Sequence, residues 1–174
     1  MMIAYTMTSR RGDTDLLLSE VADRLQAQGV KICGTVQINT ERADSHRCDM
    51  DVRVLPDGPV IRISQSLGKE ARGCRLDPNA LETAVVQAKS ALLQGAEVLI
   101  INKFGKHEAG GRGFRDLIAE AMMLDVRVLV GTNELNKQAF LDFTGGEAIL
   151  LPPLVDPLLA WVCTPDSADI DVAV

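Results

Sequence analysis

The N-terminal segment most constrains what this chain can fold into, because a strand, a polar loop and a helix follow one another there without a gap. Residues 2–7 are mostly apolar, residues 8–13 are polar and include Gly12, and residues 14–28 repeat apolar side chains at helical spacing. A phosphate-binding loop of the pattern G-x-x-x-x-G-K-[ST] is built in this order. The segment therefore predicts the first unit of an α/β fold with an anion-binding loop.

The loop matches part of that motif but lacks the motif's lysine. Between Met7 and Thr14, Gly12 and Thr14 match the pattern, whereas Met7 stands for the first glycine and Asp13 for the lysine. The lysine of the motif reaches the β and γ phosphates, and a carboxylate in its place repels them. This degenerate loop favours the fold while arguing against its usual activity.

Strand and helix signals alternate along the rest of the chain and predict a three-layer α/β/α sandwich around a mostly parallel sheet. Two strands around the turn at residues 56–59 predict a β-hairpin inserted between the α/β units. The expected strands are residues 2–7, 30–38, 49–55, 60–64, 97–101, 126–130 and 148–151. The expected helices are residues 14–28, a helix from Asp77 to near Gly95, residues 114–124, residues 133–143 and a short helix around Trp161.

Length and composition limit the organisation and the partners. With 174 residues, of which 47% are hydrophobic, we expect one domain over residues 1–164 and an acidic, flexible tail over residues 165–174. A net charge of -6 argues against nucleic acid as a partner and against binding to anionic membrane surfaces. The sequence has no C-x-x-C pair and no apolar run that would predict membrane insertion, so we expect a cytoplasmic protein with reduced thiols.

A second segment carries a resemblance to a known family. Residues 98–114 read VLIINKFGKHEAGGRGF and, with the N-terminal unit, resemble the small nucleoside triphosphatases related to human cancer-related nucleoside triphosphatase; Gly105, Glu108 and Phe114 fit that family's pattern. The segments ISQSLGKEARGCRLDP and TGGEAILLPP make the chain similar to a bacterial family of unknown function in the same P-loop superfamily, whose genes often lie near molybdate transport genes. The resemblance spans residues 2–161 and implies a P-loop NTPase-like fold.

The chain departs from the pattern of these triphosphatases where chemistry would occur. The resemblance implies an acidic residue that helps to hold magnesium and a carboxylate that activates water, and these positions are Asn102 and Lys103 here. Efficient hydrolysis is therefore not expected. Because the two sites lie close together in P-loop folds, Lys103 either forms a salt bridge with Asp13 or serves the same anion as a relocated lysine. The alternative is that both are solvated loop charges.

Three segments are candidates for binding an anion. The first offers backbone amides, hydroxyls and guanidinium groups ahead of a helix; the second is the glycine-rich stretch 110–113 with Arg112, or else only a flexible helix entry; the third is segment 64–75, a lid or a surface connection. The predicted nucleotide- or anion-binding residues are Ser9, Arg10, Arg11, Gly12, Asp13, Thr14, Asn102, Lys103 and Arg112.

Catalytic and metal-binding residues are less clearly marked. Lys103, His107 and Glu108 are the candidates for contacting phosphate or exchanging a proton, although a single His in a charged loop is usually solvated. His46 and Cys48 have no second pair at a zinc-site spacing, so we predict no metal site. Cys74 lies between arginines that favour its thiolate, or is simply a buried small residue.

Three functions remain open from the sequence. The favoured hypothesis is a binder of a nucleotide such as ATP or GTP, or of an oxyanion such as phosphate or molybdate, without efficient hydrolysis and with an accessory or sensor role in molybdenum metabolism. The first alternative is an active nucleoside triphosphatase or phosphotransferase with rewired residues. The second is a protein-interaction domain with a filled-in site, which could act as a homodimer.

Overall fold

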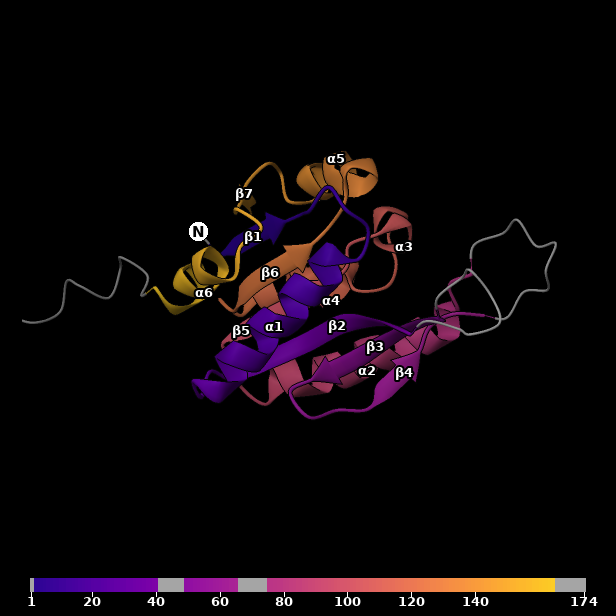
Figure 1. Ribbon diagram of the computed structural model, residues 1–174, viewed down its shortest axis with the longest axis horizontal. Coiled ribbons are helices and arrows are strands. Elements are labelled where there is room, and N and C mark those ends of the chain that lie inside the picture. Colours follow the sequence, from indigo (N-terminus) through magenta and orange to yellow (C-terminus); the bar gives the residue numbers. More distant parts are fainter. Residues whose placement is uncertain (1, 41–48, 66–74, 165–174) are drawn as a thin grey trace, which may run out of the picture.

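Apolar strands form the centre of the molecule, as the computed structural model shows for residues 2–40, 49–65 and 75–164. The sheet has seven strands in the order β4-β3-β2-β5-β6-β1-β7 (Figure 1). Neighbours are parallel from β2 to β7, and β3 and β4 continue the sheet in antiparallel fashion. The strands are β1 (Ile3–Thr6), β2 (Ile32–Thr40), β3 (Asp49–Leu55), β4 (Val60–Arg62), β5 (Val98–Asn102), β6 (Arg127–Gly131) and β7 (Ile149–Leu150).

Helices cover both faces of this sheet and bury two apolar clusters against it. One face carries α1 (Asp13–Ala27) and α6 (Val155–Cys163), with Leu18 and Leu25 of α1 packed in the same cluster as Ile100 of β5. The other face carries α2 (Pro78–Leu93), α4 (Arg115–Met123) and α5 (Glu134–Phe143). A one-turn helix, α3 (Lys106–Ala109), follows β5. The predicted three-layer sandwich is confirmed.

The predicted hairpin is also confirmed, and it joins the main sheet. Strand β3 pairs with β2 over seven residues, from Gly34 opposite Leu55 to Thr40 opposite Asp49. The structure adds α3, which the sequence pattern did not predict because four residues carry no periodicity. The expectations for His46, Cys48, Cys74 and the tail at 165–174 lie outside the described residues, as does most of segment 64–75.

The start of α2 shows why this helix begins where it does. The Asp77 carboxylate accepts the backbone N–H of Asn79 at 2.9 Å and that of Ala80 at 3.2 Å, and Pro78 occupies the first turn, where a missing N–H costs nothing. The predicted N-cap is confirmed. It places the first turn of α2 beside the carboxyl ends of β2 and β5.

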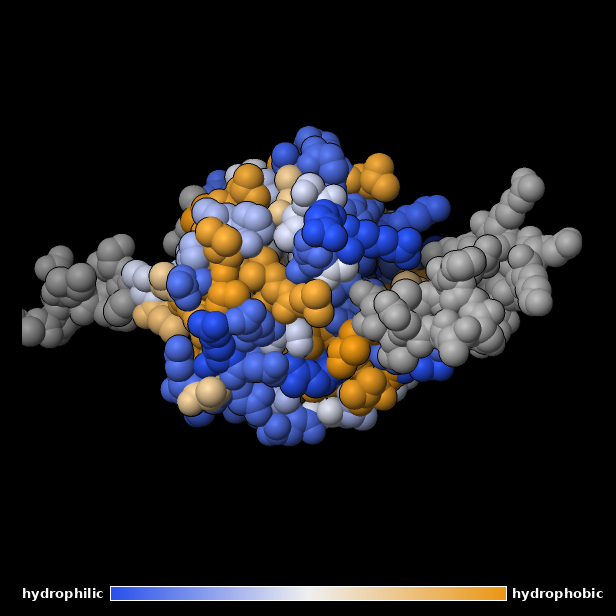
Figure 2. All heavy atoms as spheres, in the orientation of Figure 1, coloured by the Kyte–Doolittle hydropathy of each residue, from blue (hydrophilic) through white to orange (hydrophobic). Residues whose placement is uncertain are grey.

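On the face shown in Figure 2, apolar atoms gather where α1 and α6 lie side by side. Hydrophilic atoms lie around much of that apolar area, and further apolar atoms lie at the lower right, in the region of β3 and β4. Among the described residues, no helix combines the length and the hydrophobicity that crossing a membrane requires.

Strands β2 and β5 approach each other so closely at one position in the sheet that only glycine fits there. Gly34 in β2 has φ of 108°, and a Cβ there would overlap the carbonyl oxygen of Ile100 and lie within 2.9 Å of that residue's backbone C and N atoms. Gly29, which follows α1, has a comparable φ of 81° but no atom within 4 Å of its Cβ position. Both positions disfavour L side chains, but only Gly34 also lacks space.

We therefore expect Gly34→Ala to destabilise the protein much more than Gly29→Ala. The Gly29 variant should lose about 1–2 kcal/mol, the cost of a left-handed L residue. The Gly34 variant should lose more than about 4 kcal/mol or fail to fold, because its Cβ must displace backbone. Urea unfolding followed by circular dichroism measures both, and equal losses would contradict the close approach of β2 and β5.

Candidate functional site

A cavity of about 640 Å³ lies at the carboxyl ends of β2 and β5. Open α/β sheets place their ligands at this edge, and the volume falls in the usual range of small-molecule pockets. Its lining comes from the loop before α1, from β2 and β3, from the start of α2 and from the segment around α3. The lining residues are Arg11, Gln37, Met50, Ile63, Arg75, Leu76, Pro78, Leu81, Asn102, Lys103, Gly105, Lys106, His107, Glu108, Gly110 and Arg112.

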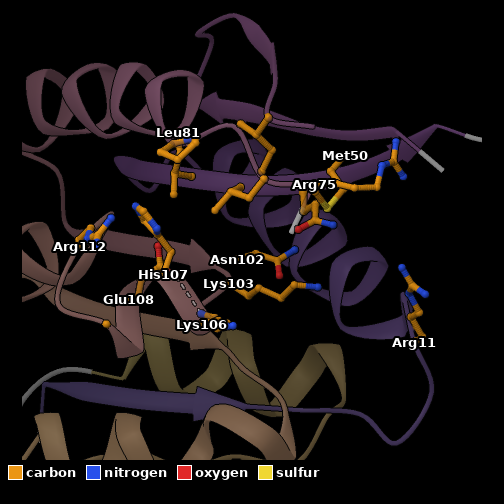
Figure 3. Close-up of a pocket in the computed structure, with 16 residues that line it drawn as sticks. Arg11, Met50, Arg75, Leu81, Asn102, Lys103, Lys106, His107, Glu108 and Arg112 are labelled. Carbon is orange, nitrogen blue, oxygen red and sulfur yellow. Dashed lines mark hydrogen bonds between the residues drawn. The ribbon is translucent and has the colours of Figure 1, made fainter. Parts of the chain in front are cut away.

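Cations are spread along the cavity, with Arg112 and Arg11 at opposite ends and Lys103 and Lys106 between them (Figure 3). Arg11, Lys106 and Arg112 are exposed and form no ion pair with any residue that the structure describes. Arg75 is held differently, since its guanidinium lies 3.5 Å from the Asp49 carboxylate. Among the described residues of the cavity lining, Glu108 is the single acidic one, so cations outnumber acids there.

Another part of the wall is apolar. Ile63 and Leu81 are buried, and Met50 and Leu76 pack against the same cluster. Figure 3 shows Met50 and Leu81 across the cavity from Lys103 and Lys106. A ligand that fills this space meets a hydrocarbon surface on one side and ammonium groups on the other.

Asn102 lies between these two sides, at the last position of β5. Its side chain is 2% exposed, and neither its Oδ1 nor its Nδ2 atom has a hydrogen-bond partner among the described residues. Buried side-chain polar atoms are normally paired, and an unpaired one costs about 1–3 kcal/mol. Asn102 belongs to the cavity lining, but its two amide atoms are covered by protein, and its Oδ1 lies 3.2 Å from the position that a Cβ of Gly131 would take.

The predicted salt bridge between Lys103 and Asp13 is replaced by a different one. The Nζ atom of Lys103 lies 3.9 Å from Oδ1 of Asp15, whose side chain is 6% exposed. Asp13 is 45% exposed and lies 4.0 Å from Arg10 instead. The correction has a geometric reason: Asp13 begins α1 on its outer side, while Asp15 is on the buried face of the same turn.

Hydroxyl groups of the degenerate loop form hydrogen bonds within the loop itself. Thr14 Oγ1 lies 2.8 Å from Thr8 Oγ1 and accepts the backbone N–H of Thr8 at 3.1 Å. In a phosphate-binding loop this hydroxyl contacts Mg²⁺. Here it bonds within the loop, which turns into α1 at Gly12 with φ of 91°.

The structure brings six of the predicted residues to the cavity: Arg11, Asn102, Lys103, His107, Glu108 and Arg112. The other predicted residues, Ser9, Arg10, Gly12, Asp13 and Thr14, belong to the same loop as Arg11 but are not part of the cavity lining. Sequence reasoning missed Gln37, Met50 and Asp15. The first two face the cavity through the pairing of β2 with β3, which no local pattern encodes, whereas the buried position of Asp15 follows from its helical register with Leu18.

Glu108 has a clear structural role. Its carboxylate accepts the backbone N–H of Gly105 at 2.9 Å and that of Phe114 at 3.4 Å, and the residue is 3% exposed. These bonds close the segment that carries Lys106 and Arg112. Burial raises the pKa of this carboxyl above its ordinary value, against the opposite effect of the backbone hydrogen bonds. His107 is nearby and lies 3.9 Å from Glu82.

No group of three or more His, Cys, Asp or Glu residues suited to holding a metal ion occurs in residues 2–40, 49–65 and 75–164. Two acidic groups at the cavity are already engaged, Asp15 by Lys103 and Glu108 by backbone amides.

The raised pKa of Glu108 predicts a pH-dependent stability. Because the folded state holds the proton more tightly than the unfolded state, this contribution is complete below the ordinary pKa of 4.5 and is lost as the pH rises through the higher folded value. We expect the unfolding free energy of the wild type to fall relative to that of Glu108→Gln between pH 4 and pH 7. Glutamine keeps one of the two hydrogen-bond acceptors. The loss of the other lowers the unfolding free energy by the same amount at every pH.

Urea unfolding of both proteins across this pH range tests the expectation, with the exposed Glu147→Gln as the control for charge removal elsewhere. A difference that stays constant, or that grows in favour of the wild type as the pH rises, would contradict it.

Two solved structures share this fold. THEP1 from the hyperthermophile Aquifex aeolicus is 17% identical, with a TM-score of 0.67 over 94% of this chain and 100% of that one. The human cancer-related nucleoside triphosphatase is 16% identical, with a TM-score of 0.62 over 86% of this chain and 87% of that one. At these identities the likeness establishes the fold alone. The expected P-loop NTPase-like fold is confirmed.

Sequence comparison gives a closer relative and a family. The molybdenum import ATP-binding protein ModC 2 of Bradyrhizobium diazoefficiens is 37% identical over 144 residues, which are 83% of this chain but 16% of that protein. The chain thus spans only a small part of this relative. Residues 3–161 match the family described as "Protein of unknown function (DUF2478)". That match covers nearly the whole chain, and the chain belongs to the DUF2478 family.

Proposed function

We propose that this chain binds a small anionic ligand, a nucleotide or an oxyanion, in the cavity at the carboxyl ends of β2 and β5, without hydrolysing it efficiently. The observation that carries the proposal is the charge of the lining: Arg11, Lys106 and Arg112 face the cavity unpaired by any described residue, and Glu108 is held by backbone amides. A site of this charge attracts anions although the whole chain carries -6.

The absence of efficient hydrolysis is proposed from what has replaced the expected chemistry. Lys103 is paired with Asp15, Thr14 is bonded to Thr8, and Asn102 provides an uncharged amide where the resemblance implies a magnesium-binding acid. Phosphoryl transfer depends on positioned cations and metal ions that neutralise charge in the transition state. The described residues around the cavity offer cations but no free carboxylate to hold a metal.

The proposal also includes a role in molybdenum metabolism. It is supported by the similarity to ModC 2, whose name describes the ATP-binding protein of a molybdenum importer. Because the chain spans 16% of that protein, the transport activity is not transferred to it. We propose instead an accessory or sensor protein that responds to its ligand by binding it.

Thermal unfolding with ATP, GTP, phosphate, sulfate and molybdate, each with and without Mg²⁺, tests this function. A ligand present at 100 times its Kd should stabilise the protein by about 2.7 kcal/mol. Lys106→Ala and Arg112→Ala should each reduce the stabilisation, because each removes a cation from the cavity. Lys31→Ala is the matched control, since Lys31 is exposed at the opposite end of β2.

Two outcomes would overturn the proposal. If none of these anions shifts the unfolding temperature, the cavity does not bind them. If the wild type releases phosphate from ATP or GTP well above the rate in buffer, and Lys103→Ala abolishes this release, the chain is an active triphosphatase with rewired residues.

A further inference from the structure

We propose that the ligand of this cavity is an organic anion with a hydrocarbon body. Its charged group, a phosphate or a carboxylate, lies at Lys106 and Arg112, and its body lies against the apolar wall of the cavity. The residues of this apolar wall are Met50, Ile63, Leu76 and Leu81. The inference rests on the proposed function, because it keeps the anion and adds the chemistry of the group that carries it.

The apolar wall is built where the β-hairpin meets α2. Met50 belongs to β3, Ile63 follows β4, and Leu81 lies in the first turn of α2. A bridge between Leu76 and Ser64 joins the remaining residue to this region. All four side chains pack in one apolar cluster, but Met50 and Leu76 are only partly buried. The cavity therefore exposes hydrocarbon that the core does not cover.

The two cations lie on the same face of the sheet as the apolar wall. Lys106 and Arg112 belong to the segment between Phe104 and Phe114. Both of these phenylalanines are buried in the apolar cluster to which the apolar wall belongs. The segment is therefore anchored over that face, and its exposed cations border the same cavity.

A contact between this segment and α2 brings the cations to the apolar wall. The Nε2 atom of His107 lies 3.9 Å from Oε1 of Glu82, and Glu82 follows Leu81 in α2. Because His107 is next to Lys106 in the chain, the contact holds the cationic segment beside the first turn of α2. Figure 3 shows Lys106 across the cavity from Leu81. One small molecule can thus place an anion at Lys106 and a hydrocarbon group at Leu81.

A bare oxyanion or a sugar phosphate uses only part of this lining. Phosphate or molybdate meets the cations but leaves the apolar wall in contact with water and most of the 640 Å³ unfilled. A sugar would place hydroxyl groups against hydrocarbon, where they lose hydrogen bonds to water. A hydrocarbon body removes apolar area from water without this loss. The volume limits that body to the size of a small molecule.

Isothermal titration of the chain with inorganic phosphate, ribose 5-phosphate and ethyl, butyl and hexyl phosphate tests the inference. The alkyl phosphates carry the same charged group on hydrocarbon bodies of increasing length. Each methylene that is buried should tighten binding by up to about fourfold, so hexyl phosphate should bind at least about tenfold more tightly than ethyl phosphate. It should also bind at least about tenfold more tightly than ribose 5-phosphate, whose body is polar. The heat-capacity change of binding should become more negative along the alkyl series.

Two variants separate the apolar wall from the cations. Met50→Gln keeps the length of the side chain but makes part of the apolar wall polar, so it should weaken the binding of hexyl phosphate at least about threefold and leave inorganic phosphate unchanged. Lys106→Ala should weaken the binding of both ligands alike, because both use the cation.

Met123→Gln is the matched control for the first variant. Met123 is exposed at the end of α4 and is not part of the cavity lining, so this variant should leave all affinities unchanged. The unfolding temperature without ligand shows whether each variant is folded, and the ligand series on the wild type needs no variant.

The outcomes distinguish the inference from the proposed function. If hexyl phosphate binds no more tightly than ethyl phosphate or ribose 5-phosphate, the hydrocarbon body is wrong while anion binding stands. The same conclusion follows if Met50→Gln weakens the binding of inorganic phosphate as much as that of hexyl phosphate. If none of the phosphates binds, both the inference and the proposed function fail.

Discussion

The position of β5 between two parallel neighbours is the constraint on which the rest of this structure depends. All five of its residues are buried, and it pairs with β2 on one side and with β6 on the other. Leu99 and Ile101 enter one apolar cluster, and Ile100 enters the other. The strand cannot shift its register without moving side chains to the wrong face. The residue that ends it, Asn102, is therefore fixed at the edge of the sheet.

The segment that follows β5 lines the cavity next to Asn102. Glu108 sits in the middle of the turn and uses its carboxylate to hold the backbone at Gly105 and Phe114. Gly113 approaches Glu108 so closely that a Cβ there would collide with the carboxylate. One buried acid thus shapes a segment whose exposed side chains, Lys106 and Arg112, are cationic. In the described part of the lining, Glu108 is the one acidic residue, and its carboxylate is directed at backbone amides rather than at these cations.

Local patterns predicted the elements well, since buried parallel strands and capped helices leave strong signals. The alternation of strands and helices, the N-cap at Asp77 and the hairpin around residues 56–59 were all visible in the sequence. Contacts between distant segments were not. The partner of Lys103 is Asp15 and not Asp13 because the helical register, and not the match to a motif, decides which carboxylate faces the sheet. Likewise Met50 reaches the cavity only because β3 pairs with β2.

The fold does not require the residues of the expected chemistry, because the fold and that chemistry depend on different side chains. Most of the burial that holds the sheet comes from the apolar clusters, in which Asp13, Asn102 and Lys103 take no part. The side chains of Asp13 and Lys103 therefore contribute little to the stability of the sandwich. Lys103 has a new partner in Asp15, and Asp13 faces solvent near Arg10. Asn102 is the exception, since it is buried and neither of its amide atoms has a hydrogen-bond partner among the described residues. Its uncharged amide avoids the much larger cost of burying a carboxylate at the same position.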